Sequence, residues 1–186
     1  MSTNSWNMDG TWTLFLDRDG VINERIMNGY VTNVDEFKFL EGSESAISGL
    51  TRLFNRVLVV TNQQGIGKGL MTERNLLEIH AYMCDQVYLS GGKIDKCYFA
   101  PNLKEAEDDM RKPGPAMAEM AQLEFPEIDF RYSVMVGDTD SDILFGKNLG
   151  MRTVRILTEV ETNSVQADLE VYNLQDFLNF VRNERN

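Results

Sequence analysis

Two aspartates, Asp17 and Asp19, follow directly after the short apolar run 12–16, and their spacing suits them to chemistry. An apolar run of that length, bounded by a polar turn, predicts a buried strand. Open α/β sheets bind their ligands at the carboxyl ends of their strands. Two carboxylates so close together resist joint ionisation unless a cation neutralises them, so the pair predicts a metal-assisted site. The alternative is an ordinary solvated turn, because Asp and Gly are common turn residues.

Polar clusters also follow two later apolar runs, and a basic pair lies between them in the chain. These segments are Thr61-Asn62-Gln63 after the run 57–60, Arg111-Lys112-Pro113, and Gly137-Asp138-Thr139-Asp140-Ser141-Asp142 after the run 133–136. Parallel strands bring their carboxyl ends to one edge of a sheet. We therefore expect these segments to lie beside Asp17, although they are far apart in the sequence.

The residue types in these segments suit phosphoryl transfer. A carboxylate can attack phosphorus and form an aspartyl-phosphate, which splits hydrolysis into two easier steps. A second carboxylate can protonate the leaving oxygen and later activate water. Two or three carboxylates suffice for Mg²⁺, which keeps several of its waters. A threonine hydroxyl and a lysine ammonium can hold the phosphoryl oxygens as charge shifts.

Strand-like and helix-like segments alternate along the chain, and this alternation positions the clusters. It predicts an α/β fold in which a parallel sheet carries helices on both faces. The predicted strands are 12–16, 57–60, 96–99, 133–136 and 153–156, and the predicted helices are 43–54, 72–89, 115–123, 140–149 and 174–181. We expect one domain over residues 1–186, with its core at about 12–157, because a chain of 186 residues fits a single domain.

Composition narrows the possible partners. The formal net charge is −11, and such an acidic surface argues against binding of nucleic acid or anionic membranes. The two cysteines, Cys84 and Cys97, lack C-x-x-C spacing and are expected to be reduced thiols. Segment 1–10 lacks the pattern of a secretory signal, and no apolar run approaches a membrane span. We expect a soluble, cytoplasmic protein and favour a monomer.

Four motifs in order resemble the haloacid dehalogenase (HAD) superfamily of phosphatases, and more narrowly the histidinol-phosphate and heptose-bisphosphate phosphatases. The motifs are Asp17-x-Asp19-Gly-Val-Ile, Thr61-Asn62-Gln63, Arg111-Lys112-Pro113 and Gly137-Asp138-x-x-x-Asp142. The resemblance covers about residues 14–156. It implies a three-layer, Rossmann-like (HAD-like) fold and a Mg²⁺-dependent phosphomonoesterase that acts through an aspartyl-phosphate. A sugar phosphate such as heptose bisphosphate is the first choice of substrate, and histidinol phosphate the second.

The resemblance also implies a role for each matching residue. Asp17 would be the nucleophile and Asp19 the general acid and base. Thr61 and Lys112, the other catalytic residues, would bind the transferred phosphoryl group. The candidate substrate-binding or phosphate-binding residues are Arg18, Asn62, Arg111, Lys112 and Thr139. The candidate Mg²⁺ ligands are Asp17, Asp19 through its backbone carbonyl, Asp138 and Asp142.

The chain departs from the pattern of these phosphatases in two places. They usually carry a zinc loop before the Arg-Lys-Pro motif, with a Cys-x-His and a Cys-x-Cys pair. The corresponding positions here are Ala100, Asn102, Asp108 and Met110. No thiolate is in register, so we expect no zinc. Thr139 stands where the heptose enzymes resemble one another in carrying a basic residue, so an extra anionic group on the substrate would lose that contact.

The spacing of the motifs bears on access to the site. Predicted helices and strands fill most of the intervals 17–61 and 61–112, which leaves no room for a large cap domain. We expect an open site bordered by the loops 24–37 and 100–111. The glycine-rich segment 65–69 lacks the spacing of a nucleotide-binding loop and is expected to be a tight turn. His80, the only histidine, falls in a predicted helix and is expected to be packed or solvated rather than bound to metal.

Two other functions use the same residue types. A phospho-acceptor switch of the receiver-domain kind combines acidic residues, a threonine and a lysine, but its phosphorylated aspartate ends a middle strand, whereas Asp17 ends the first. A nucleic-acid 3′-phosphatase resembles this chain in its Thr-Asn-Gln and Arg-Lys-Pro motifs, but the net charge of −11 argues against that substrate.

Overall fold

A six-stranded parallel sheet forms the centre of the molecule. The structure is a computed structural model that describes residues 6–103, 110–158 and 164–185. The strand order is β3-β2-β1-β4-β5-β6, and each neighbouring pair is parallel. The strands are β1 (Thr13–Leu16), β2 (Arg56–Asn62), β3 (Lys96–Ala100), β4 (Ser133–Gly137), β5 (Arg152–Ile156) and β6 (Leu169–Val171).

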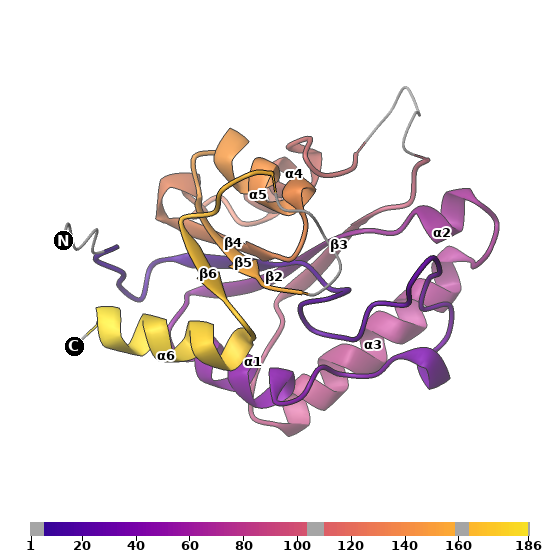
Figure 1. Cartoon of the computed structure of the whole chain (residues 1–186), viewed down its shortest axis with the longest axis horizontal. Coiled ribbons are helices and arrows are strands. Elements are labelled where there is room, and N and C mark those ends of the chain that lie inside the picture. Colours follow the sequence, from indigo (N-terminus) through magenta and orange to yellow (C-terminus); the bar gives the residue numbers. More distant parts are fainter. Residues whose placement is uncertain (1–5, 104–109, 159–163, 186) are drawn as a thin grey trace.

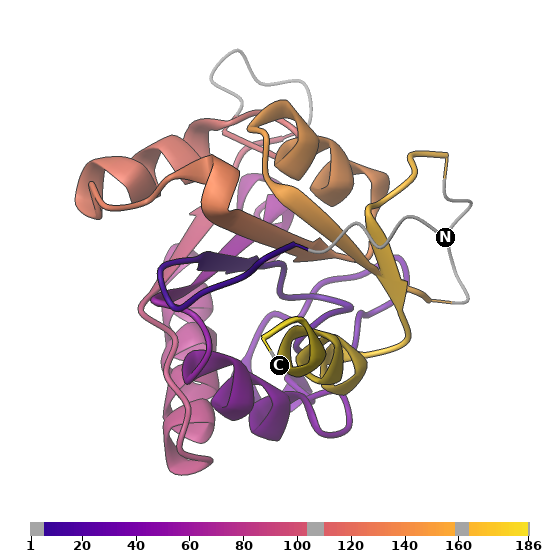
Figure 2. The same ribbon diagram turned by 90° about the vertical axis from the view of Figure 1, so that its left-hand side faces the viewer.

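Helices cover both faces of this sheet (Figures 1 and 2). The helices are α1 (Ser43–Thr51), α2 (Gln64–Gly67), α3 (Glu73–Leu89), α4 (Ala116–Glu124), α5 (Asp140–Asn148) and α6 (Leu174–Glu184), with the 3-10 helices η1 (Val34–Glu36) and η2 (Phe130–Tyr132). Helices α1, α3 and α6 pack on one face, and α4 and α5 pack on the other (Figure 2). The predicted three-layer, Rossmann-like fold is thereby confirmed.

The strands alternate between the two apolar cores that lie on either side of the sheet. Leu14 and Leu16 face the core formed with α1, α3 and α6, whereas Phe15 faces the core formed with α4 and α5. Side chains on a strand point to opposite faces in turn, so a strand buried on both faces is apolar throughout. The run 12–16 has this pattern, and it places β1 between β2 and β4 at the middle of the sheet.

Four short elements were not predicted from the sequence: β6, α2 and the 3-10 helices η1 and η2. Strand β6 has only three residues, and Glu170 at its centre interrupts the apolar run. Helix α2 occupies most of the predicted tight turn, although glycine is a poor helix former. A Cβ on Gly67 would lie 2.7 Å from the carbonyl oxygen of Pro101, so the close approach of these two backbones requires glycine at this position.

The two ends of the described chain lie together. The backbone amide of Trp6 donates a hydrogen bond to Glu184 Oε2 at 2.6 Å, and the Trp6 and Phe180 rings meet edge to face at 5.1 Å.

None of the described helices is both long enough and apolar enough to cross a bilayer. In the described parts of the chain no second folded unit covers the carboxyl edge of the sheet, as predicted (Figure 1). The single domain over residues 1–186 stays a prediction.

Candidate active site

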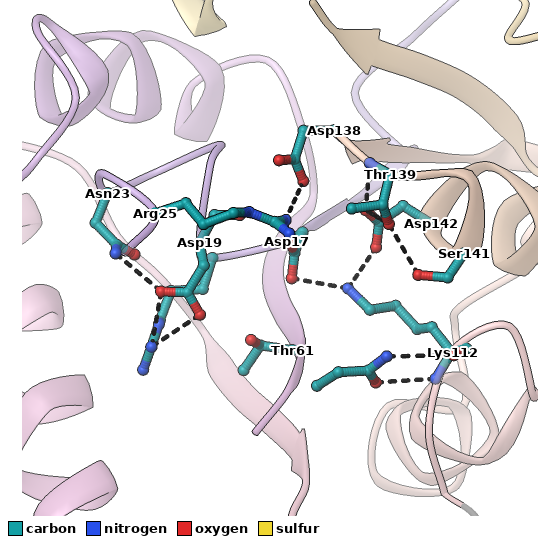
Figure 3. Close-up of polar contacts among 12 residues, drawn as sticks. Asp17, Asp19, Asn23, Arg25, Thr61, Lys112, Asp138, Thr139, Ser141 and Asp142 are labelled. Carbon is teal, nitrogen blue, oxygen red and sulfur yellow. Dashed lines mark hydrogen bonds and ion pairs between the residues drawn. The ribbon is translucent and has the colours of Figure 1, made fainter. Parts of the chain in front are cut away.

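The carboxyl ends of β1, β2 and β4 meet at one edge of the sheet and border a pocket of about 410 Å³. Asp17 follows β1, Thr61 lies at the end of β2, and Asp138 follows β4 (Figure 3). The predicted site residues that line this pocket are Asp17, Asp19, Thr61, Asn62, Arg111, Lys112, Thr139 and Asp142. Asp138 lines an adjoining cavity of about 410 Å³. One of its carboxylate oxygens lies within 4.8 Å of a carboxylate oxygen of Asp17 and of Asp142.

Lys112 joins two buried carboxylates. Its Nζ lies 2.8 Å from Asp17 Oδ1 and 2.6 Å from Asp142 Oδ1, and it donates a third hydrogen bond to the carbonyl oxygen of Val60 at 2.7 Å. Burial alone lowers the pKa of a lysine, but here the charges of Asp142 and Asp17 outweigh it and the pKa of Lys112 is raised. The ammonium is therefore a fixed positive charge at the base of the pocket.

Asn62 holds the loop that carries Lys112. Its Oδ1 accepts a hydrogen bond from the Lys112 backbone amide at 2.9 Å, and its Nδ2 donates to the Lys112 carbonyl oxygen at 3.2 Å. Both polar atoms of the amide are thus engaged with the backbone of one residue. Asn62 lines the pocket, and its contacts position Lys112; its role in binding substrate or phosphate stays a prediction.

The carboxylate of Asp19 is held by three donors. Arg18 Nη2 lies 2.8 and 2.9 Å from its two oxygens, Asn23 Nδ2 donates to Oδ1 at 2.9 Å, and Gln63 Nε2 donates to Oδ2 at 2.8 Å. Burial raises the pKa of Asp19, but the Arg18 charge and these hydrogen bonds outweigh burial and lower the pKa overall. The same Gln63 amide donates to Thr61 Oγ1 at 2.9 Å, which links the two predicted catalytic groups.

The expected role of Arg18 needs a correction. Its side chain is fully buried, pairs with Asp19, and lines neither cavity at this edge. The chain bends at Arg18, two residues after β1 ends, and the side chain is directed into the protein beside the Asp19 carboxylate. Arg18 is therefore placed to orient Asp19 from beneath and not to contact phosphate in the pocket.

Three buried aspartates converge on the position predicted for a metal ion. One carboxylate oxygen each from Asp17, Asp138 and Asp142 lies within 4.8 Å of the others. Burial, together with neighbouring acidic groups, raises the pKa of Asp17 to about 6 and that of Asp138 to about 8. Such crowded carboxylates ionise together when a cation joins them, and oxygen donors of this kind are the ligands Mg²⁺ prefers. The donor set therefore fits Mg²⁺.

The turn between β4 and α5 orients Asp142. Asp142 Oδ2 accepts hydrogen bonds from the Thr139 hydroxyl at 2.7 Å and from the Thr139 amide at 3.0 Å. Burial raises the pKa of Asp142, but Lys112 and these hydrogen bonds lower it by more. Asp140 points away from the cluster, and its carboxylate pairs with Arg155 at 2.6 Å.

Comparison with known proteins assigns the family. A family model described as HAD-hydrolase-like matches residues 109–177. The D-glycero-alpha-D-manno-heptose-1,7-bisphosphate 7-phosphatase of Burkholderia mallei is 35% identical to this chain over 90% of its length and 92% of that protein. The D-glycero-beta-D-manno-heptose-1,7-bisphosphate 7-phosphatase of Helicobacter pylori is 30% identical over 91% of this chain and 96% of that protein.

This chain belongs to the HAD-like family of heptose-bisphosphate phosphatases. It is a HAD-type phosphatase, a hydrolase of phosphoric monoesters. A solved structure, the D,D-heptose 1.7-bisphosphate phosphatase from B. bronchiseptica complexed with magnesium and phosphate, matches its fold with a TM-score of 0.85 and 25% identity. The match covers 94% of this chain and 99% of that chain.

Several residues of this phosphatase site were missed from the sequence. Gln63 and Asn23 lie within or beside the recognised motifs, but their amide contacts to Asp19 depend on side-chain direction. A second group of missed residues lines the pocket itself and includes Arg25, Tyr30, Gln64, Lys68 and Ser141. Arg25 has no motif of its own, and it contacts Asp138 from 113 positions away in the chain. No pattern within the sequence signals that contact.

The positions that correspond to the zinc loop of related phosphatases offer few metal ligands. Ala100 is the last residue of β3, Asn102 and Met110 lie in the loop that follows, and Asp108 falls outside the described residues. His80 packs in α3 with its ring 6.2 Å from that of Phe99. Within the described residues, the aspartate cluster at Asp17 is the one group with the geometry to hold a metal ion.

Proposed function

We propose that this HAD-type phosphatase hydrolyses one phosphoester of a D-glycero-D-manno-heptose 1,7-bisphosphate and that it requires Mg²⁺. The observation that carries the proposal is the nucleophile position: Asp17 borders an open pocket and is held there by the buried Lys112. Support for the substrate comes from the relatives, which are named for the alpha and the beta forms of this sugar bisphosphate. Support for the metal comes from the three converging aspartates.

The charges along the pocket support a substrate that carries two phosphate groups. Lys112 neutralises the end at which Asp17 lies. Arg111 and Lys68 also line the pocket, so it offers positive charge beyond that needed by one phosphoryl group. Lys68 Nζ donates to the Tyr30 hydroxyl at 3.0 Å, and this contact holds the ammonium at the pocket wall. We infer that Arg111 and Lys68 bind the phosphate that stays on the sugar.

The reaction that we propose takes place in two steps. An oxygen of Asp17 attacks phosphorus while the ester bond to the sugar breaks, and Asp19, once it has taken up a proton from solvent, gives that proton to the departing oxygen. Asp19 then takes a proton from water as that water attacks phosphorus and the bond to Asp17 breaks. Thr61 and Lys112 hold the phosphoryl oxygens during both steps. Inorganic phosphate leaves, and each aspartate returns to its starting state.

The metal would be held by Asp17, Asp138 and the backbone carbonyl of Asp19, with Asp142 supporting the site through Lys112. When bound, Mg²⁺ supplies positive charge that offsets the charge of the phosphoryl group and of the carboxylates. Gln63 and Asn23 keep the Asp19 carboxylate oriented toward the leaving oxygen. Arg18 holds the same carboxylate from the buried side.

A phosphate-release assay with Mg²⁺ and with excess chelator tests the proposal. The panel contains both anomers of the heptose 1,7-bisphosphate, histidinol phosphate, other sugar phosphates and a 3′-phosphorylated oligonucleotide. We expect one heptose anomer to have the highest kcat/KM, the product to keep its phosphate at position 1, and chelation to abolish turnover. Faster cleavage of histidinol phosphate or of the oligonucleotide overturns the substrate. A long-lived phosphorylated protein after treatment with acetyl phosphate would indicate a switch instead.

A further inference from the structure

Arg25 contacts three of the groups that are assigned above to the metal. A single nitrogen, Nη2, lies 2.7 Å from Asp138 Oδ1 and donates to the backbone carbonyl oxygen of Asp19 at 3.0 Å. The same nitrogen lies 4.0 Å from Asp17 Oδ2. Figure 3 shows the guanidinium reaching in between Asp17 and Asp138 from the loop that follows Asn23. A positive charge from this chain therefore stands among the metal ligands.

This nitrogen and a metal ion compete for the same space. Mg²⁺ binds its oxygen ligands at about 2.1 Å in a near-octahedral arrangement. An ion at that distance from Asp138 Oδ1 and from the Asp19 carbonyl oxygen overlaps the position of Arg25 Nη2. The guanidinium must leave these oxygens before they can bind the metal.

The two cations of the cluster differ in how firmly they are held. The side chain of Lys112 is 2% exposed, and Val60 gives it a further hydrogen bond. The side chain of Arg25 is 34% exposed and extends from a loop. Charge pairs with one exposed partner are weaker than fully buried pairs. Arg25 is therefore the exchangeable cation, and Lys112 is the permanent one.

The displaced guanidinium has space to enter. Arg25 lines the main pocket, and it also lines the adjoining cavity that contains Asp138 and Tyr172. Each cavity has a volume of about 410 Å³. A rotation of the long side chain about its own bonds moves the charge into either cavity without a change in the sheet. The exchange needs no movement of the strands that carry the aspartates.

We propose that Arg25 is a positioning residue that holds the metal ligands together until a divalent cation replaces it, and that it thereby weakens the apparent affinity for metal. The proposal rests on the metal site of the proposed function. Because the guanidinium spends part of its time among the ligands, only the remaining fraction of molecules can bind metal. The phosphatase would then need a higher concentration of free divalent cation than the same metal ligands would need without Arg25.

Titration of protein stripped of divalent cations with Mn²⁺, with free Mn²⁺ followed by electron paramagnetic resonance, tests this proposal. Arg25→Gln removes the competing charge, and Lys68→Gln removes a charge from the same pocket whose hydrogen bond goes to the Tyr30 hydroxyl. We expect Arg25→Gln to bind Mn²⁺ about tenfold more tightly than the original protein, which corresponds to a competent fraction of about one in ten. We expect Lys68→Gln to change the affinity less than twofold.

Thermal unfolding gives a second readout. Without divalent cations, Arg25→Gln should unfold at a lower temperature, because three buried carboxylates then share Lys112 alone. With saturating Mn²⁺ its Tm should rise by more than that of the original protein, because tighter binding of the folded state gives greater stabilisation. Equal Mn²⁺ affinity in the two proteins, or equal tightening in Lys68→Gln, overturns the proposal.

Failure of this inference is distinguishable from failure of the proposed function. If the original protein binds Mn²⁺, Asp138→Asn does not, and Arg25→Gln matches the original, only the role of Arg25 is wrong. If neither the original protein nor Arg25→Gln binds Mn²⁺, the metal site itself is wrong. Should Arg25→Gln not fold without metal, Arg25→Met carries the same test, because it keeps an apolar stem and adds no polar group.

Discussion

Lys112 Nζ lies 2.8 Å from Asp17 Oδ1, although 95 positions separate the two residues in the chain. The contact is buried on both sides, with side-chain exposures of 2% and 8%. Asp17 enters it from the end of the first strand, and Lys112 enters from the loop before α4. The pair therefore joins the end of β1, at the middle of the sheet, to the segment between β3 and α4, and it couples the charge of the nucleophile to the stability of the fold.

Replacement of Lys112 by Met should impair both activity and stability. Asp17 and Asp142 would then be buried with one cation fewer, and breaking a buried ion pair in this way costs about 3–5 kcal/mol. Phosphate release should fall by a factor of about a thousand or more, because the phosphoryl oxygens also lose a charged donor. Urea unfolding and the phosphate-release assay measure the two effects. Lys147→Met, at an exposed position of α5, serves as the control and should behave as the original protein.

Replacement of Gln63 by Ala should lower kcat more than it changes KM. The amide donates to Asp19 Oδ2 and to Thr61 Oγ1, so its loss lets both groups rotate away from their catalytic positions. Misplacement of a general acid typically costs about 10²–10⁴-fold in rate. Gln122→Ala loses a single hydrogen bond to the carbonyl oxygen of Ile128 and should leave kcat unchanged. A rise in KM with unchanged kcat in Gln63→Ala would contradict the positioning role.

Replacement of Gly20 by Ala should disrupt the metal ligands. A Cβ at this position would lie 2.2 Å from Asp138 Oδ2, and Gly20 has a φ of +92°. Gly150→Ala is a matched control, because Gly150 also has a positive φ, of +76°, and no atom lies within 4 Å of its added Cβ. Both variants suffer backbone strain of about 1–2 kcal/mol. We expect only Gly20→Ala to lose Mn²⁺ binding, and equal binding losses in the two would remove the clash with Asp138 as the cause.

His80 should make the fold less stable as the pH falls. Burial, together with the nearby Arg18 charge, lowers the pKa of His80 from 6.5 to about 3. The unfolded chain takes up a proton below pH 6.5, whereas the folded protein does so only near pH 3. The neutral, buried His80 therefore contributes its full stabilisation above pH 6.5. This contribution is lost progressively as the pH falls from 6.5 toward 3.

The variant His80→Gln isolates this effect. Between pH 6.5 and pH 5, the free energy of unfolding of the original protein should fall by about 2 kcal/mol more than that of His80→Gln. Urea unfolding at both pH values gives the difference, and the carboxylates, which both proteins share, cancel from it. Parallel losses in the two proteins would show that His80 is protonated in the folded state.

The fold and the members of the site were largely readable from the sequence. Short apolar runs that end in polar turns marked β1, β2 and β4, because strands buried on both faces are apolar throughout. The aspartates after β1 and β4 follow from the same pattern, since the carboxyl ends of parallel strands share an edge. Helices α1 and α3 were visible from their apolar spacing.

The sequence did not predict in which direction these side chains point, or which charged residues pair across long distances in the chain. Arg18 was expected to bind substrate or phosphate, but the chain bends at this residue and its side chain is buried beside Asp19. Arg25 was overlooked because its partner Asp138 comes from a different strand. Asn62 lay in a recognised motif. The hydrogen bonds between its side-chain amide and the Lys112 backbone became visible only in the folded structure, where the two segments lie together.

The hydrogen bond from the Trp6 amide to Glu184 brings the beginning and the end of the described chain together ahead of β1. The catalytic groups lie at the opposite ends of the strands. Circular permutation of the described fold should therefore be tolerated: a short linker that joins Trp6 to Glu184, with new ends opened in an exposed helix connection, would leave the reacting groups in register. A fusion partner attached at Trp6 or at Glu184 would likewise lie away from the pocket that substrate enters.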